Sequence, residues 1–135
     1  MIYAVIDTNI FVSSFITKSS TSPTRRVINS LFDGKIKPLY NDDILQEYEV
    51  VLLRKKFQLA ERDVKMLLDF IKVHGINSTR YPYDGNMPDD DDRVFYEVAL
   101  SEEDSFLVTG NLKHFPRTPK VVTAAQIMEI IDQQL

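Results

Sequence analysis

The chain has 135 residues, of which 44% are hydrophobic, and it carries a net charge of −4 at pH 7. This length supports one domain with a sizeable core, so we expect residues 1–135 to form a single domain. The composition, with 4 Gly and 6 Pro, excludes a disordered or fibrous chain. The absence of cysteine excludes a disulfide framework and a thiolate metal site. Without a signal peptide or a long apolar stretch, we expect a cytoplasmic protein with no membrane partner.

Charge is unevenly distributed along the sequence. Residues 1–80 contain 12 basic and 9 acidic side chains, a balance of +3, whereas residues 81–135 contain 4 and 11, a balance of −7. The net charge argues against a polyanionic partner, but a basic rim in the first part could bind phosphates. The candidates for this rim are Arg25, Arg26, Lys35, Lys37, Arg54, Lys55 and Lys56. The alternative is that these residues are simply a solvated surface.

Short apolar runs alternate with amphipathic stretches along the chain. Strands are predicted at residues 2–6, 35–40, 76–81, 105–109 and 120–123. Helices are predicted at residues 23–32, 44 to near 57, 62–74, 89–99 and 124–133. Gly34 and Gly75 are predicted to end two of these helices. The alternation predicts an α/β fold with a mostly parallel sheet of about five strands, covered by helices on both faces.

Asp7 directly follows the first predicted strand, so its carboxylate is held at the edge of the core. Sites in parallel sheets lie beyond the carboxyl ends of the strands, where Asp7 and the segment after Thr109 would both arrive. A structural alternative is that Asp7 caps a turn, as aspartates often do where strands end.

Glu47 lies three residues after Ile44 and four before Val51, which places it at the edge of the buried stripe of its helix. An acid in that position needs a partner. The alternative is a surface glutamate that pairs with Arg54 or Lys55, an arrangement of low energetic value.

Four consecutive aspartates, at positions 89–92, repel one another unless a cation or a helix dipole compensates their charge. Helical spacing favours Asp92 as a metal ligand, with Asp89 and Asp91 as second choices. Capping of a solvated helix could explain one or two of these acids, but not all four. Oxygen ligands that converge from separate places in a chain suit a hard divalent cation.

Other kinds of site find little support in the sequence. His74 and His114 are too isolated for a zinc site, and we interpret both as structural. The chain has no glycine-rich phosphate loop, no nucleophile elbow and no Ser-His-Asp order.

Four segments together resemble PIN domains (PilT N-terminus), specifically the group that includes toxins of toxin–antitoxin systems. The segments are AVIDTN at 4–9, ILQEY at 44–48, PDDDDRVF at 88–95 and LVTGN at 107–111. Their order and spacing extend over almost the whole chain. The resemblance implies a three-layer α/β/α sandwich and a ribonuclease that depends on one or two Mg²⁺ or Mn²⁺ ions.

By position, the resemblance implies that the catalytic, metal-binding residues are Asp7, Glu47 and Asp92. It also implies supporting roles for Thr8, Asn9 and Thr109. A homodimer, an RNA substrate and a small antitoxin protein are the partners that the family suggests.

Asn111 departs from the family pattern, because many relatives have a further aspartate at this position. An amide can donate one carbonyl oxygen or orient a water, but it adds no charge. A second metal ion would therefore be held less firmly, unless Asp89 or Asp91 supplies the missing charge.

Two other functions stay open at this point. A catalytically degenerate PIN module could bind RNA or a protein without cleaving it, and Asn111 favours this alternative. An aspartyl-phosphate hydrolase or receiver-like domain also uses Mg²⁺ and an aspartate at the end of a strand. However, phosphatases of the haloacid dehalogenase type use Asp-x-Asp, and here the third position is Asn9.

Overall fold

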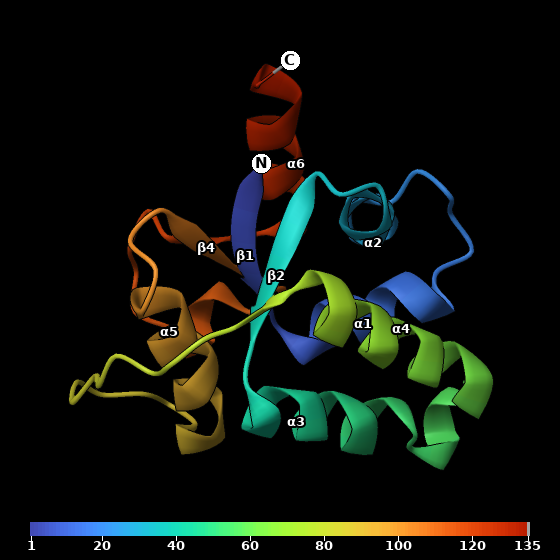
Figure 1. Cartoon of the computed structure of the whole chain (residues 1–135), viewed down its shortest axis with the longest axis horizontal. Helices are drawn as coiled ribbons and strands as arrows, with labels where there is room; N and C mark the ends of the chain where they lie inside the picture. The colour runs from blue at the N-terminus through green and yellow to red at the C-terminus, as the bar shows by residue number, and fades with distance from the viewer. Residues whose placement is uncertain (135) are drawn as a thin grey trace.

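The computed structural model describes residues 1–134, and its centre is a sheet of five parallel strands in the order β3-β2-β1-β4-β5. The strands are β1 (Ile2–Ile6), β2 (Ile36–Tyr40), β3 (Ile76–Asn77), β4 (Ser105–Val108) and β5 (Val121–Val122). All four strand pairs are parallel, as the alternation of strands and helices predicts. The chain leaves β1 toward β2 on one side and later returns to β4 on the other, so the sheet has a topological switch point at β1 (Figure 1).

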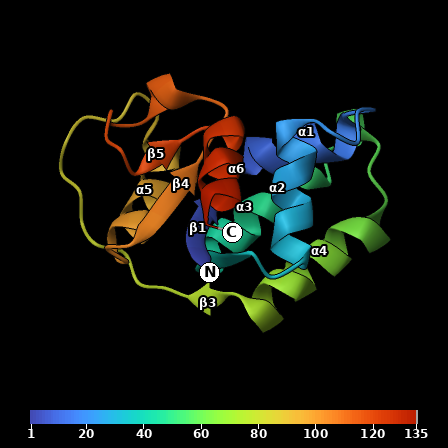
Figure 2. The same cartoon turned by 90° about the horizontal axis from the view of Figure 1, so that it is seen from above.

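Helices cover both faces of the sheet and complete a three-layer α/β/α fold. They are α1 (Thr8–Ile16), α2 (Pro23–Phe32), α3 (Asp42–Leu52), α4 (Glu61–His74), α5 (Arg93–Leu100) and α6 (Ala124–Gln133). Helix α5 lies on one side of the sheet, whereas α1, α2, α4 and α6 lie on the other (Figures 1 and 2). Helix α3 contacts α1, α4 and α5 at the end of the molecule where β1 and β2 end. Within residues 1–134, no helix is long and apolar enough to cross a membrane.

Side-chain caps fix where several helices begin. The Ser22 hydroxyl accepts a hydrogen bond from the Arg25 backbone N–H at 3.3 Å, and Pro23 occupies the first helical position of α2. The Asn41 side chain caps α3 by accepting from the Ile44 N–H at 2.9 Å. Helix α6 begins with a capping box between Thr123 and Gln126. These local signals explain why most helix starts follow from the sequence.

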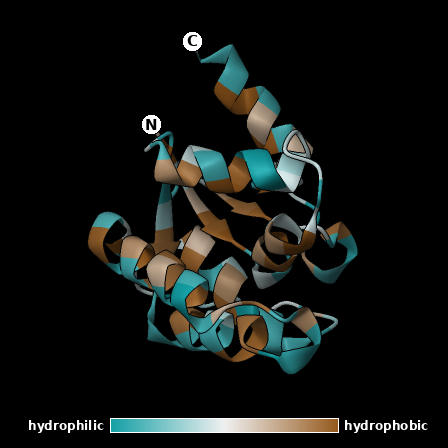
Figure 3. Ribbon diagram, turned by 90° about the vertical axis from the view of Figure 1, so that its right-hand side faces the viewer, coloured by the Kyte–Doolittle hydropathy of each residue, from teal (hydrophilic) through white to brown (hydrophobic). Residues whose placement is uncertain are grey.

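The core is continuous and lies on both faces of β1. The side chains of Ala4, Val5 and Ile6 are all buried, as are Leu107 and Val108 of the neighbouring β4. Figure 3 shows the hydrophobic strands in the interior and helices that turn hydrophilic residues outward. A central parallel strand is buried on both faces, which explains the unbroken apolar run at residues 2–6.

Four elements differ from the sequence-based expectations. The helix expected from residue 89 begins at Arg93, after a separate three-ten turn (Asp90–Asp92). Helix α1 is absent from the sequence-based expectations, because Thr8 and Asn9 are polar and such residues are also typical of the end of a strand. Helix α3 ends at Leu52 and not near residue 57, where a separate three-ten turn (Lys55–Phe57) follows. The third strand, expected over residues 76–81, pairs only at Ile76–Asn77.

Gly75 ends α4 as expected, but for a different reason from a left-handed cap. Its φ is −86°, which any residue can adopt. A Cβ at this position would lie 2.5 Å from the Ile71 carbonyl oxygen and 2.7 Å from the Pro38 carbonyl oxygen. Glycine is therefore required by the close approach of α4 to β2.

Tyr48 connects α3 to the end of the central strand. Its buried hydroxyl donates a hydrogen bond to the Ile6 carbonyl oxygen, and its ring packs edge-on against Phe11 of α1 at a centroid distance of 5.0 Å.

We expect Tyr48→Phe to lower the free energy of unfolding by about 1–2 kcal/mol, the usual cost of removing one partner of a buried hydrogen bond. Urea denaturation measures this change. Tyr81→Phe is the matched control, because Tyr81 is 64% exposed, and an equal loss in both variants would contradict a specific role for Tyr48.

Candidate active site

The register between β1 and β4 brings Asp7 and Thr109 side by side. Ile6 pairs with Val108, so the next residue of each strand lies at the same edge of the sheet. The Asp7 N–H donates to the Val108 carbonyl oxygen at 2.9 Å, and the Thr109 hydroxyl donates to Asp7 Oδ2 at 2.7 Å. This edge is the topological switch point, where ligands of parallel sheets bind.

Asp7 is buried, with only 7% of the residue exposed. The pKa of Asp7 is raised to about 6, because burial and the charges of Asp92 and Glu47 outweigh the hydrogen bonds from Thr109 and the Thr8 backbone, which lower it. Asp7 occupies the N-cap position of α1, yet its side chain makes no capping hydrogen bond. The turn-capping alternative therefore does not account for this residue.

Glu47 comes to the same site from α3. It is half-buried, and its carboxylate accepts a hydrogen bond from the Thr8 hydroxyl. Burial raises the pKa of Glu47, and the charges of Asp92 and Asp91 add to this effect, whereas the bond from Thr8 and the charge of Arg54 lower the pKa. Glu47 is thus held by a hydroxyl of α1 and not by a surface ion pair.

Asp92 is the member of the acid run that turns inward. Its side chain is 17% exposed, at the start of α5, and its Oδ2 lies 3.3 Å from His114 Nδ1. Burial raises its pKa, the charges of Asp89 and Asp91 raise it further, and His114 lowers it. Asp92 therefore lies among acids on one side and against an imidazole on the other.

The other three aspartates of the run are exposed. The Asp89 carboxylate accepts the Asp91 N–H at 3.0 Å and caps the short three-ten turn Asp90–Asp92. Asp90 pairs with Arg93 at 2.7 Å. Asp91 lines a shallow depression together with Glu47. The structure thus gives each acid a different environment and explains why the run is tolerated.

Asn9 and Asn111 lie around the end of β4. The Asn9 side-chain oxygen accepts the Gly110 N–H at 3.3 Å, which ties the start of α1 to the segment after β4. The Asn111 N–H donates to the Thr109 hydroxyl at 3.0 Å, while its side chain is exposed. Asn9 therefore orients the backbone of this segment, and Asn111 presents its amide to solvent.

The candidate RNA-binding residues separate into two groups. Arg25 donates to the Ser14 carbonyl oxygen at 3.1 Å, and Arg26 pairs with Asp132 at 3.1 Å, so both contribute to packing around α2. Arg54 is close enough to Glu47 to lower its pKa. The two lysines that follow, at positions 55 and 56, are exposed in the three-ten turn after α3. Only the second group extends from an element of the site.

Sequence reasoning missed two residues at this site. His114 was interpreted as structural, yet it contacts Asp92; its position three residues after Asn111 was the available signal. Arg80 lines the depression that contains Glu47 and Asp91. No local pattern marks Arg80, because its position depends on how the segment before α5 packs on that helix.

The donor set of this site fits a hard divalent cation. Asp7, Glu47 and Asp92 offer only oxygen donor atoms, and burial together with the charges of neighbouring acids raises the pKa of each one. Across residues 1–134, no three acidic or histidine side chains are already arranged as a metal-binding group. The Thr8 and His114 contacts hold two of these acids in their present positions.

Comparison with known families agrees with this geometry. The PIN domain family matches residues 3–113, a range that contains Asp7, Glu47 and Asp92. The chain belongs to the PIN domain family. PIN domains are typically nucleases that act on nucleic acids and generally use divalent metal ions. No curated protein and no solved structure matches the chain.

The buried charge of Asp7 predicts a specific pH dependence of stability. The folded-state pKa of about 6 lies above the ordinary value of 3.8, so the folded protein binds the extra proton between these values. In a buffer with chelator, stability should therefore fall as pH rises through this window. Asp7→Asn should remove that loss and be more stable than the wild type by about 3 kcal/mol above pH 6.

Urea denaturation of both proteins between pH 3.5 and 8 tests this expectation. Asp69→Asn is the matched control, because Asp69 is exposed on α4. If the free energy of unfolding depended on pH equally in the wild type and in Asp7→Asn, burial of the Asp7 charge would not be a cost to stability.

Proposed function

We propose that this PIN domain is a ribonuclease that depends on Mg²⁺ or Mn²⁺ and hydrolyses phosphodiester bonds of RNA. The observation that supports the proposal is that Asp92, at the start of α5, lies close enough for its charge to raise the pKa of both Asp7, which follows β1, and Glu47 on α3. Three partly or fully buried acids whose pKa values are raised by burial and by neighbouring acids are costly to keep without a cation. In a nuclease of this family, such a site would bind the divalent metal ion.

Asp7, Glu47 and Asp92 are the residues that would hold the ion. When bound, Mg²⁺ or Mn²⁺ lowers the pKa of a water and polarises a phosphoryl oxygen. Hydroxyl groups of the chain fix the ligands around it, since Thr109 holds Asp7 and Thr8 holds Glu47. Asp89 and Asp91 are exposed at the edge of the site and are the candidates for a second ion.

The charge of the site also bears on the substrate. An acidic site repels RNA until cations fill it, and a bound cation then reverses the local field. Arg54, together with Lys55 and Lys56, extends from α3 as a positive surface that can contact the RNA backbone. Arg25 and Arg26 have less support, because both make contacts within the fold.

The resemblance of the sequence supports a narrower proposal, that the protein is the cytoplasmic toxin of a toxin–antitoxin pair and acts as a homodimer. Expression that stops growth in the wild type but not in Asp7→Asn would support a toxin role. Growth unaffected by the wild type would contradict it.

We expect pure protein to cleave a labelled structured RNA with Mg²⁺ or Mn²⁺ and not with EDTA. Asp7→Asn should lose this activity by at least 100-fold, because the most buried of the three oxygen ligands loses its charge. Gel electrophoresis of the products measures the rate. The control Asp69→Asn removes one exposed acid and should cleave like the wild type.

Cleavage by both Asp7→Asn and the wild type at equal rates would overturn the assigned site. RNA binding without any metal-dependent cleavage would favour the degenerate module, which the neutral side chain of Asn111 supports. Release of phosphate from a generic phosphomonoester would favour the aspartyl-phosphate hydrolase instead.

The neutral side chain at position 111 gives a second prediction. Asn111→Asp should tighten Mn²⁺ binding, about tenfold, because it adds a charge at the end of β4 where Thr109 already contacts Asp7. Isothermal titration with Mn²⁺ measures the affinity. Asn29→Asp makes the same charge change on the exposed surface of α2, and an equal gain in both variants would remove residue 111 from the site.

A further inference from the structure

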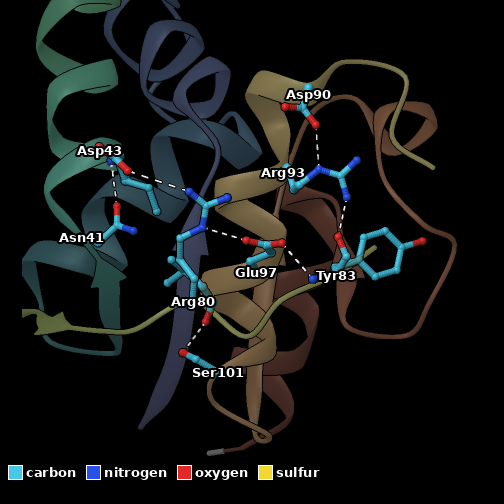
Figure 4. A network of polar contacts seen from close by, with 10 residues as sticks. Asn41, Asp43, Arg80, Tyr83, Asp90, Arg93, Glu97 and Ser101 are labelled. Carbon is cyan, nitrogen blue, oxygen red and sulfur yellow. Dashed lines mark hydrogen bonds and ion pairs between the residues drawn. The ribbon is translucent and has the colours of Figure 1, made fainter. Parts of the chain in front are cut away.

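Arg80 is anchored by a buried carboxylate. Its Nε donates a hydrogen bond to Glu97 Oε1 at 2.7 Å, and the Glu97 side chain is only 9% exposed on α5. Although burial raises the pKa of Glu97, the hydrogen bonds from the Tyr83 N–H and from Arg80 lower it below its ordinary value. Glu97 thus stays charged and fixes one edge of the guanidinium (Figure 4).

The other end of this guanidinium faces the acidic depression beside the site. Arg80 Nη1 lies 3.9 Å from Asp43 Oδ2, which is a loose contact, and the Arg80 side chain is 40% exposed. The depression has a volume of about 280 Å³ and is lined by Asp43, Glu47, Arg80, Asp90, Asp91 and Val94. Arg80 is the only basic residue among them. Its terminal N–H groups therefore border the same depression as Glu47.

Anchoring of the loop alone does not explain this position. Arg93 already ties the loop to α5, because its Nη1 donates to the carbonyl oxygens of Tyr83 and Gly85 and its Nε pairs with Asp90. In Figure 4, Arg93 comes from the start of α5, whereas Arg80 comes from the segment between β3 and α5 and is directed toward Asp43 on α3. Arg80 thus keeps terminal donors that the fold does not use for backbone carbonyls.

We propose that Arg80 is a phosphate-binding residue of this site and holds a phosphodiester group of the RNA strand next to the one that is cleaved. The proposal rests on the ribonuclease function proposed above and adds a substrate contact to it. A guanidinium presents paired N–H groups that match two phosphate oxygens. A phosphate would replace the loose contact to Asp43, while the short bond to Glu97 keeps the guanidinium in place.

The test compares Arg80→Gln with Arg62→Gln, which removes the same charge from an exposed position on α4. Binding of a short fluorescent single-stranded RNA is measured by anisotropy in EDTA and in Ca²⁺, and cleavage is measured in Mn²⁺. Arg80→Gln should weaken binding by about tenfold to a hundredfold, as expected for loss of charged hydrogen bonds. In Arg80→Gln, KM for cleavage should rise with little change in kcat. Arg80→Lys should recover part of the RNA affinity, and Arg62→Gln should behave like the wild type.

A second pair of variants covers the case in which Arg80→Gln does not fold. Asp43→Asn removes the acid that competes for Arg80, whereas Asp42→Asn removes a neighbouring acid of the same helix turn. RNA binding should tighten in Asp43→Asn by more than in Asp42→Asn. Equal effects of the two changes would overturn the role of Arg80.

The outcomes separate this proposal from the function on which it rests. RNA binding that depends on Arg80, without metal-dependent cleavage by the wild type, would leave Arg80 in its role and overturn the ribonuclease. Cleavage by the wild type with unchanged RNA binding and KM in Arg80→Gln would overturn Arg80 alone. Absence of RNA binding by the wild type would also overturn the proposal for Arg80.

Discussion

The burial of one carboxylate, that of Asp7 at the end of the central strand, is the constraint on which the site depends. A charge removed from water is unfavourable, and the hydrogen bond from Thr109 compensates only part of that cost. The register of β1 and β4 fixes both groups, so the fold cannot relax this strain by moving Asp7 outward. A cation bound beside this carboxylate would compensate its charge and stabilise the folded protein.

The core and the site share the same supports. Tyr48 bonds the carbonyl oxygen of Ile6, directly before Asp7, while Glu47, its neighbour in sequence, meets the Thr8 hydroxyl directly after Asp7. Consecutive residues of α3 therefore hold the backbone and present a carboxylate at the same strand end. This coupling explains how a carboxylate on a helix can be placed reliably beside one on a strand.

Electrostatic balance organises the segment between β3 and α5. The second part of the chain carries an excess of seven negative charges, and the acid run lies within it. Arg93 forms an ion pair with Asp90, and His114 contacts Asp92. Arg80 is held by Glu97 and lies between the acids of α3 and those of the run. These three side chains each contact a particular acid, whereas neither Asp7 nor Glu47 forms a salt bridge among residues 1–134.

The sequence by itself determined the strands, most helix starts and the meeting of Asp7 with Thr109, because apolar runs, caps and the rule for parallel strand ends are local signals. It also singled out Glu47 and Asp92 by helical spacing, and in the structure the charges of both raise the pKa of Asp7. Helix α1 was missed because Thr8 and Asn9 are polar and resemble the end of a strand. Only the tertiary structure decided the contacts of His114 and Arg80, since both depend on loops that pack against α5 and that no local pattern specifies.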